Sequence, residues 1–176
     1  MLRRLGLGVV LATGGVLVVA LAVTLVSYGG SNGKSSSAAT EALKRQSDLY
    51  EISLIERAFH EAISKKDVDK MVGLFSEHAT GTFGPGRTVS GRTQIRDVWL
   101  ASTAWKPQTR WVSDHPAYKL KVTIDGDRGT LHFECHFVNV DTEKVAAVTA
   151  GSADVARIDG QWLITNFVGS TSELKI

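Results

Sequence analysis

The stretch that decides the fold is Thr130-Leu131-His132-Phe133-Glu134-Cys135-His136-Phe137-Val138-Asn139-Val140, in which apolar and polar side chains alternate. Successive side chains of a β-strand point to opposite faces of its sheet. The apolar set is Leu131, Phe133, Cys135 and Phe137, and the polar set is His132, Glu134 and His136. This alternation is typical of an antiparallel strand with one face on the core. We expect the apolar set to face the core and the polar set to face solvent or a subunit partner.

Turn signals flank this strand on both sides. Asp125–Gly129 precedes it and Asp141–Lys144 follows it; Asp159-Gly160, the strongest hairpin signal in the chain, lies farther on. Pro116 bends the stretch before the first turn, because proline cannot donate a ladder hydrogen bond. The expected strands cover residues 109–124, 130–140, 145–158 and 161–168. Consecutive strands joined by short turns predict an antiparallel meander.

The chain upstream of the meander has a helical period. Apolar residues recur there at steps of three and four, which predicts a long amphipathic helix from Thr40 to Lys66. Asp67 is a helix N-cap for a shorter second helix, and a third helix follows Gly91. A short strand over 79–83 lies between them. Helices followed by a meander predict an α+β fold with the helices on one face of a curved sheet.

The N-terminal segment predicts where the domain works. Leu5–Val26 contains no charged residue and is long enough, as a helix, to cross a hydrocarbon core of about 30 Å. Arg3 and Arg4 precede it, so the positive-inside rule keeps the N-terminus in the cytoplasm. We expect a single-pass anchor over residues 1–28 in the cytoplasmic membrane, with the C-terminal domain outside, periplasmic or extracellular.

A cleaved signal peptide is the alternative interpretation of this segment. Ala20-Leu21-Ala22 fits the small-x-small cleavage pattern, although the apolar run continues past it to Val26. Residues 29–40 are rich in glycine and serine and predict a flexible linker. Residues 41–176 then form one domain. Its single cysteine excludes an intrachain disulfide, and the nearly balanced charge of +2 disfavours nucleic-acid binding.

Three segments together resemble the SnoaL-like branch of the nuclear-transport-factor-2-like superfamily. They are Ile55-Glu56-Arg57-Ala58-Phe59 with Lys66 to Thr80, then Ser90-Gly91-Arg92-Thr93-Gln94-Ile95, and then Val155 to Ile164. The resemblance implies a cone, in which a curved, mostly antiparallel sheet wraps around a long helix and leaves a pocket at its open end. It says little about activity, because one fold hosts enzymes, binding modules and assembly domains.

The ketosteroid isomerases of that superfamily provide a test for catalysis. The resemblance places their helix tyrosine at Phe59, their carboxylate base near Phe83 and their late-strand acid at Asp154. Neither phenylalanine can exchange a proton, so isomerase chemistry by that mechanism is not expected. Asp154 and His115 remain the candidate catalytic residues, with an ion pair or an exposed loop position as their structural alternatives.

Aromatic side chains are the candidate ligand contacts. Trp105 and Trp111 flank a loop, where exposed aromatic residues often contact a ligand or a partner. The full candidate set is Phe59, Phe83, Trp99, Trp105, Trp111 and Tyr118. His60 and His78 are expected at the surface, and Cys135 as an inert buried thiol. The polar triplet of the deciding strand lacks a recognisable fourth ligand, so we expect no metal site and no cofactor.

These features predict a membrane-tethered module outside the cytoplasm that binds a small apolar ligand or a protein partner without catalysis. We expect a homodimer through the open sheet face. One alternative is an acid/base enzyme, a lyase, isomerase or hydrolase, that uses Asp154 and a histidine in the cone pocket. Another is an accessory subunit of a larger membrane complex.

Overall fold

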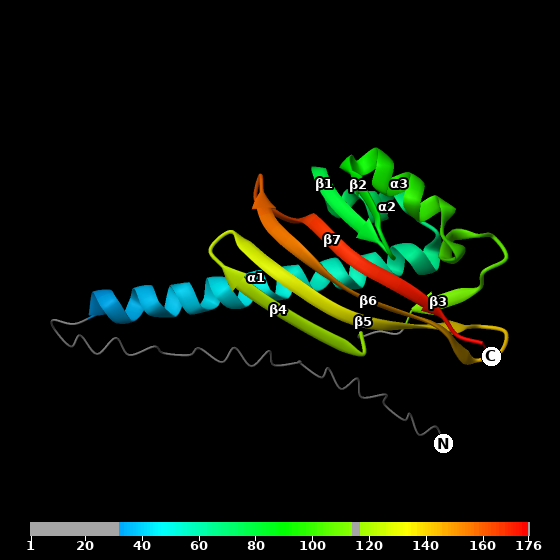
Figure 1. Cartoon of the computed structure of the whole chain (residues 1–176). Helices are drawn as coiled ribbons and strands as arrows, with labels where there is room; N and C mark the ends of the chain where they lie inside the picture. Colours follow the sequence, from blue (N-terminus) through cyan, green and yellow to red (C-terminus); the bar gives the residue numbers. More distant parts are fainter. Residues whose placement is uncertain (1–31, 114–116, 176) are drawn as a thin grey trace, which may run out of the picture.

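A computed structural model describes residues 32–113 and 117–175 of the chain, as helices along one side of a single curved sheet (Figure 1). The helices are α1 (Asn32–Lys65), α2 (Val68–Gly73) and α3 (Gly91–Ala101), followed by the short 3₁₀ helix η1 (Thr103–Trp105). The strands are β1 (Phe75–Phe83), β2 (Arg87–Ser90), β3 (Trp111–Ser113), β4 (Lys119–Asp125), β5 (Arg128–Asn139), β6 (Lys144–Ile158) and β7 (Gln161–Glu173).

The described strands form one mostly antiparallel, unclosed sheet. Its order is β2-β1-β7-β6-β5-β3, and β4 also pairs with β5. The β1–β7 pair is parallel, whereas the others are antiparallel. The three longest strands, β5, β6 and β7, pair along most of their length and form the centre of the sheet. The α+β class and the curved antiparallel sheet are therefore as expected.

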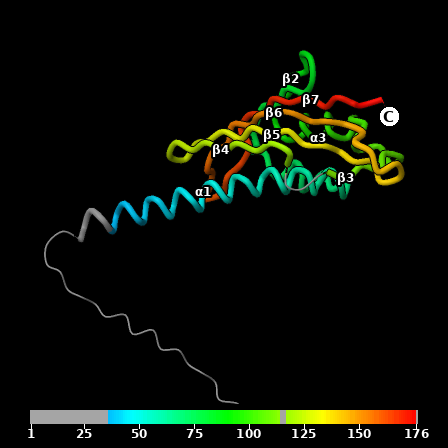
Figure 2. Tube along the Cα trace, turned by 90° about the horizontal axis from the view of Figure 1, so that it is seen from below, coloured from blue at the N-terminus to red at the C-terminus, as the bar shows by residue number. Residues whose placement is uncertain are grey.

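The long helix α1 forms a second layer under the sheet. Figure 2 shows it running beneath the strands, and its N-terminal half extends beyond the sheet in both views. Accordingly, Ser36–Ser47 is exposed, and Asp48 is the first buried residue along the described chain. The buried stripe that follows contains Ile52, Ile55, Phe59, Ala62 and Ile63. Burial of that stripe against the sheet supplies most of the helix's stability, since isolated helices are marginal in water.

Local sequence signals set the element ends. The Asp67 side chain accepts a hydrogen bond from the Lys70 backbone N–H at 2.9 Å and so caps α2. Lys66, with φ of +58°, separates the two helices. At the β6–β7 turn, Asp159 and Gly160 have φ values of +50° and +81°, as a two-residue hairpin turn requires. The predicted cap and hairpin are both present.

Several boundaries differ from the sequence-based expectation. The expected linker over 29–40 overlaps α1, because the backbone is already helical from Asn32; the segment has no proline, and Ala38 and Ala39 favour helix. Strand β2 was not expected, and it pairs with β1 across the Gly84-Pro85-Gly86 turn. The expected strand over 109–124 is divided into β3 and β4.

The predicted membrane anchor, Leu5–Val26, lies outside the described residues, as does the candidate cleavage site. Within 32–113 and 117–175, no helix combines the length and the apolar character needed to cross a membrane.

Candidate functional site

Two adjoining hollows lie between α3, η1 and the inner face of β6 and β7. Their volumes are about 220 and 200 Å³, and both are lined by Trp99, Ser102, Thr149 and Thr171. We call the pair the mouth cavity. Its other lining residues are Phe83, Gly84, Val98, Phe167, Gly169 and Ser170 in the first hollow, and Ile63, Thr103, Ala104, Trp111, Phe137 and Glu173 in the second. Together the hollows are in the size range of small-molecule sites, which begins at about 300 Å³.

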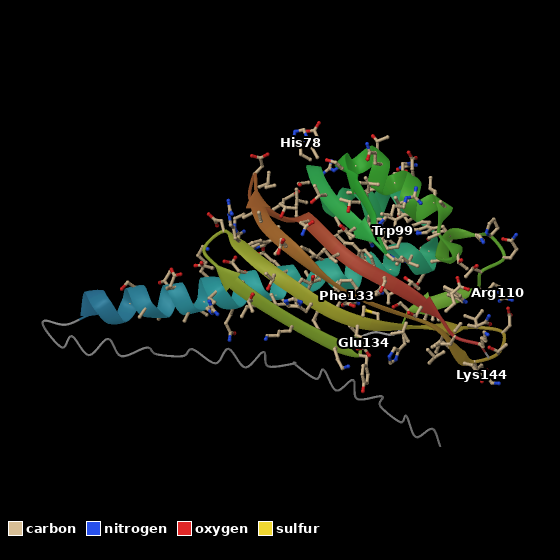
Figure 3. All side chains as sticks on the ribbon, in the orientation of Figure 1. His78, Trp99, Arg110, Phe133, Glu134 and Lys144 are labelled. Carbon is tan, nitrogen blue, oxygen red and sulfur yellow. The ribbon has the colours of Figure 1, made fainter. Side chains whose placement is uncertain are left out.

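Two polar atoms in the cavity wall stand out. The Trp99 Nε1 and the Ser102 Oγ are buried and have no hydrogen-bond partner among the described residues. In contrast, the hydroxyls of Thr149 and Thr171 bond to one another at 2.7 Å. Figure 3 shows Trp99 between α3 and the sheet. A buried donor without a partner costs about 1–3 kcal/mol, so a ligand that accepts from either group would recover free energy.

Lys66, directly after α1, contacts η1 at one side of the mouth cavity. Its ammonium group donates to the backbone carbonyl of Ala104 in η1. Burial lowers the pKa of Lys66 below its ordinary value, because the charged form is partly removed from water. The contact holds η1, and with it the second hollow, against the end of α1.

Aromatic rings form the floor of the mouth cavity. Phe59 packs edge-on against Trp99, with ring centroids 5.2 Å apart, and stacks on Phe167 at 5.7 Å. Trp111 lies against Phe137 with centroids 5.9 Å apart. These rings separate the cavity from the polar groups that lie deeper between α1 and β5.

Three ionisable side chains meet below that floor: Glu56 and His60 on α1 and Cys135 on β5. We call them the buried triad, since their exposed fractions are 4 %, 0 % and 0 %. The His60 Nε2 lies 3.0 Å from the Glu56 Oε1 and 2.6 Å from the Cys135 Sγ. The Cys135 Sγ also lies 3.5 Å from the Glu56 Oε1. Glu56 and His60 are four residues apart and therefore share one face of the helix.

The second nitrogen of His60 has its own partner. The His60 Nδ1 is 2.7 Å from the Ser113 Oγ, and the Ser113 backbone N–H donates to the Ser64 Oγ at 3.1 Å. This contact from β3 fixes the plane of the imidazole and keeps Nε2 directed at Glu56 and Cys135. The rings of Phe59, Phe133 and Phe137 surround the imidazole, with centroids 5.4 to 6.1 Å away.

The outer face of the sheet carries the polar triplet, His132, Glu134 and His136, as the alternation of β5 predicts. Lys119 donates to Glu134 at 2.8 Å, and this hydrogen bond lowers the pKa of Glu134 and raises that of Lys119. A shallow groove of about 750 Å³ crosses this face over β4 to β7. Phe133, the residue before Glu134 on β5, is buried in the core, as the alternation of the strand requires.

Of the two candidate catalytic residues, the structure describes Asp154, which does not line the mouth cavity. Asp154 is exposed on the outer face of β6, where its carboxylate accepts a hydrogen bond from Asn166 at 3.1 Å. It borders a shallow hollow that also contains Arg128. The inner-face position next to it belongs to Ala153, because side chains alternate along the strand. His115 lies outside the described residues.

The six candidate ligand contacts are divided between three places. Phe83, Trp99 and Trp111 line the mouth cavity, and Phe59 packs behind them. Trp105 is buried in the core away from the cavity lining, and Tyr118 is exposed and stacks on His136 at 4.8 Å. The expectation that Trp105 and Trp111 are exposed is wrong: they are 7 % and 8 % exposed, because η1 and β3 turn both indoles into the core.

Sequence reasoning missed the buried triad. His60 was expected at the surface but is fully buried, whereas His78 is exposed as expected. The available signal was the row Ile52, Glu56, His60, which continues the apolar stripe at four-residue steps. Two polar residues on the buried face of a helix must find partners, and Cys135, predicted to face inward, is one of them.

Sequence comparison gives one match that covers most of the domain. Residues 45–168 match the SnoaL-like domain family. No curated protein shows a significant sequence match to the chain.

Solved structures share this architecture at low sequence identity. An NTF2-like protein with a cystatin-like fold from Novosphingobium aromaticivorans is 18 % identical with a TM-score of 0.64, over 80 % of this chain and 91 % of that one. The hexachlorocyclohexane dehydrochlorinase LinA-type3 from Novosphingobium barchaimii is 13 % identical (TM-score 0.61; 76 % and 94 %). A ketosteroid isomerase-like protein from Erwinia carotovora is also 13 % identical (TM-score 0.56; 73 % and 98 %). At these identities the likeness establishes the fold alone.

Proposed function

The chain belongs to the SnoaL-like domain family, and from this premise we propose that it is a membrane-tethered module that binds a small, largely apolar ligand outside the cytoplasm without catalysis. The mouth cavity is the binding site. Its wall is mainly aromatic and aliphatic, with a few hydroxyl groups. Such a lining buries an apolar body and leaves orientation to a few polar contacts.

The observation that carries this proposal is the pair of buried donors, Trp99 Nε1 and Ser102 Oγ, in the wall shared by both hollows. Buried polar groups in folded proteins are almost always hydrogen-bonded. A ligand with one carbonyl, ether or hydroxyl oxygen near these donors would complete their hydrogen bonding. The ligand class is therefore an apolar molecule that carries at least one oxygen acceptor.

The cavity lining also supports a role without catalysis. Among its described residues, Glu173 is the only ionisable one, and it is exposed near the end of β7. General acid/base catalysis needs such a group within about 3 Å of the reacting atom. Glu56 and His60 do not line either hollow, and the rings of Phe59 and Phe137 lie between. The alternative, an enzyme that uses Asp154, has less support because Asp154 is on the outer face.

Retention of a small molecule by the full chain tests the proposal. Thr171→Phe places a ring in the cavity, whereas Ser172→Phe, the next residue of β7, places it on the outer face. The full chain and both variants are purified from native membranes in detergent, and bound small molecules are identified by mass spectrometry. We expect near-stoichiometric retention by the wild type and Ser172→Phe and at least a tenfold loss in Thr171→Phe. Equal retention by all three, or none in the wild type, would contradict the proposal.

We further propose that the partner on the outer face is a second copy of the chain. The groove there is wide and open, and its lining combines small and apolar residues such as Gly151, Val168 and Gly169 with charged side chains of β4 and β5. Val168 is 47 % exposed in this lining, where water would otherwise cover an apolar side chain. A two-fold related copy would place the same patch on both sides of the interface.

A further inference from the structure

We infer that the buried triad of Glu56, His60 and Cys135 is a binding site for a divalent transition-metal ion, with zinc as the best match. One donor atom from each residue lies within 4.8 Å of the other two. This site is distinct from the mouth cavity and from the outer-face triplet. It lies between α1 and β5, so a bound ion would join the long helix directly to the centre of the sheet.

The donor chemistry favours zinc over the harder cations. A thiolate, an imidazole nitrogen and a carboxylate oxygen are the three ligand types that protein zinc sites use. Calcium and magnesium take oxygen ligands, and a cysteine would be a poor donor for either. Three protein ligands leave one position of a tetrahedral ion for water or a small anion, as in zinc sites that are not closed.

The spacing of the donors is near that of a tetrahedral ion. Zinc bonds of about 2.0 to 2.3 Å place neighbouring ligand atoms about 3.3 to 3.6 Å apart. The Cys135 Sγ to Glu56 Oε1 distance of 3.5 Å already matches. The His60 Nε2 lies 3.0 Å from Glu56 and 2.6 Å from Cys135, so these two donor atoms would each move away from the imidazole by about 1 Å or less. Rotation of the Cys135 and Glu56 side chains can supply that movement, since both remain on their own elements.

The surroundings of the triad fit a metal ligand set in charge and orientation. Among the described residues, His60 is the one basic side chain within ion-pair distance of Glu56, and the aromatic shell around it excludes water. A divalent cation would balance a carboxylate and a thiolate, and burial of such charges is otherwise costly. Ser113 on the His60 Nδ1 is the kind of outer hydrogen bond that orients a metal-bound histidine.

Cobalt substitution tests the site because Cys135 is the only cysteine of the chain. Cells expressing the full chain are grown with Co²⁺ in place of Zn²⁺, so that the ion is available while the chain folds, and the protein is purified in detergent. A thiolate-to-cobalt charge-transfer band in the near ultraviolet can then come from Cys135 alone. We expect this band, one cobalt per chain, and one zinc per chain after growth in zinc.

Three variants define the ligands. Cys135→Ser should remove the charge-transfer band. Ser113→Ala keeps all three donors and should weaken the zinc affinity about 10- to 100-fold. His136→Asn changes the neighbouring histidine of β5, which faces outward, and should leave both the band and the metal content unchanged.

Two results would overturn the inference. The first is a wild-type chain without the charge-transfer band in cobalt-grown cells. The second is metal binding that His136→Asn abolishes, which would assign the ion to the outer-face triplet. The wild-type measurement decides the matter even if Cys135→Ser fails to fold. In either case the triad would be a hydrogen-bonded contact between helix and sheet.

Discussion

The Nε2 atom of His60 on α1 and the Sγ atom of Cys135 on β5 lie 2.6 Å apart inside an aromatic shell. Their positions place a polar contact directly under the floor of the mouth cavity, because Thr149 of the cavity wall is the cross-strand partner of Cys135. The two features are therefore neighbours within one fold. A ligand in the cavity and an ion at the triad would both depend on the packing of Phe59 and Phe137.

The orientation of the chain in the membrane is the first prediction. We expect Arg3 and Arg4 before the apolar run to keep the N-terminus inside, so the domain should lie on the outer side. Protease added to intact spheroplasts should digest the domain, as followed by an antibody to its C-terminus. A cytoplasmic marker protein should remain intact in the same sample. Full protection of the domain from the protease would contradict this orientation.

The second prediction concerns self-association through the outer face. Val168→Asp introduces a charge into the lining of the groove and should weaken dimer formation at least tenfold, because the charge loses water in the interface. Light scattering of the full chain in detergent measures the mass. Thr165→Asp, at a half-buried residue of the same strand that does not line the groove, is the control and should leave the dimer intact. A monomeric wild-type chain would contradict this prediction.

Much of this arrangement follows from the sequence, since strong local patterns decide it. The alternation in β5, the cap at Asp67 and the turn at Asp159-Gly160 each have one physical explanation, and all three are present. The buried triad could not be predicted with the same ease. Its formation depends on which inward-facing residue of β5 packs against His60 of α1. Tertiary packing decides that pairing.

The position of Asp154 illustrates a different limit. The family resemblance directs attention to Asp154 as an inward acid, whereas Ala153 and Val155 take the inward positions and leave Asp154 outside. A register shift in the β6–β7 pairing lies between Asp154 and Val155. A shift of one residue reverses the face of a side chain, and a resemblance in sequence does not fix it.

The third prediction tests the unpartnered hydroxyl of Ser102. Ser102→Ala removes a buried polar group that has no partner among the described residues, so it should raise the free energy of unfolding of the ligand-free protein by up to about 1 kcal/mol. The same change should reduce retention of the ligand. Urea unfolding followed by tryptophan fluorescence measures the first effect. Ser172→Ala, on the outer face, is the control and should change neither the free energy of unfolding nor ligand retention. A Ser102→Ala protein that is less stable than the wild type would mean that the Ser102 hydroxyl makes a hydrogen bond in the folded protein.

The fourth prediction is a pH dependence that involves Asp48 and Arg157. Burial alone would raise the pKa of the Asp48 carboxyl, but hydrogen bonds from Lys44 and Arg157 outweigh it and lower the pKa below 3.8. Because the folded value is depressed, the stabilisation is complete above pH 3.8 and is lost as the pH falls through the folded value. Arg157→Met should therefore cost about 1 kcal/mol at neutral pH and progressively less below pH 3.8.

Urea unfolding at a series of pH values measures this difference. Arg128→Met is the control, since Arg128 is an exposed arginine of β5 with no ion pair among the described residues. It should show a small effect at every pH. A cost of Arg157→Met that stays constant between neutral pH and pH 2 would assign the effect to packing on Trp162, whose ring lies 4.7 Å from the guanidinium carbon.

The last prediction compares two carboxylates with opposite surroundings. Asp154→Asn changes an exposed group bonded to Asn166, so it should alter stability by at most about 1 kcal/mol and leave ligand retention unchanged. Glu56→Gln keeps the shape of a buried group but removes the charge opposite His60, and should cost about 3 kcal/mol in metal-free protein. Both values come from urea unfolding of the full chain in detergent. Loss of ligand retention in Asp154→Asn would place Asp154 at the binding site and support the acid/base enzyme. Equal small costs for the two variants would mean that the contacts of the Glu56 side chain contribute little to stability.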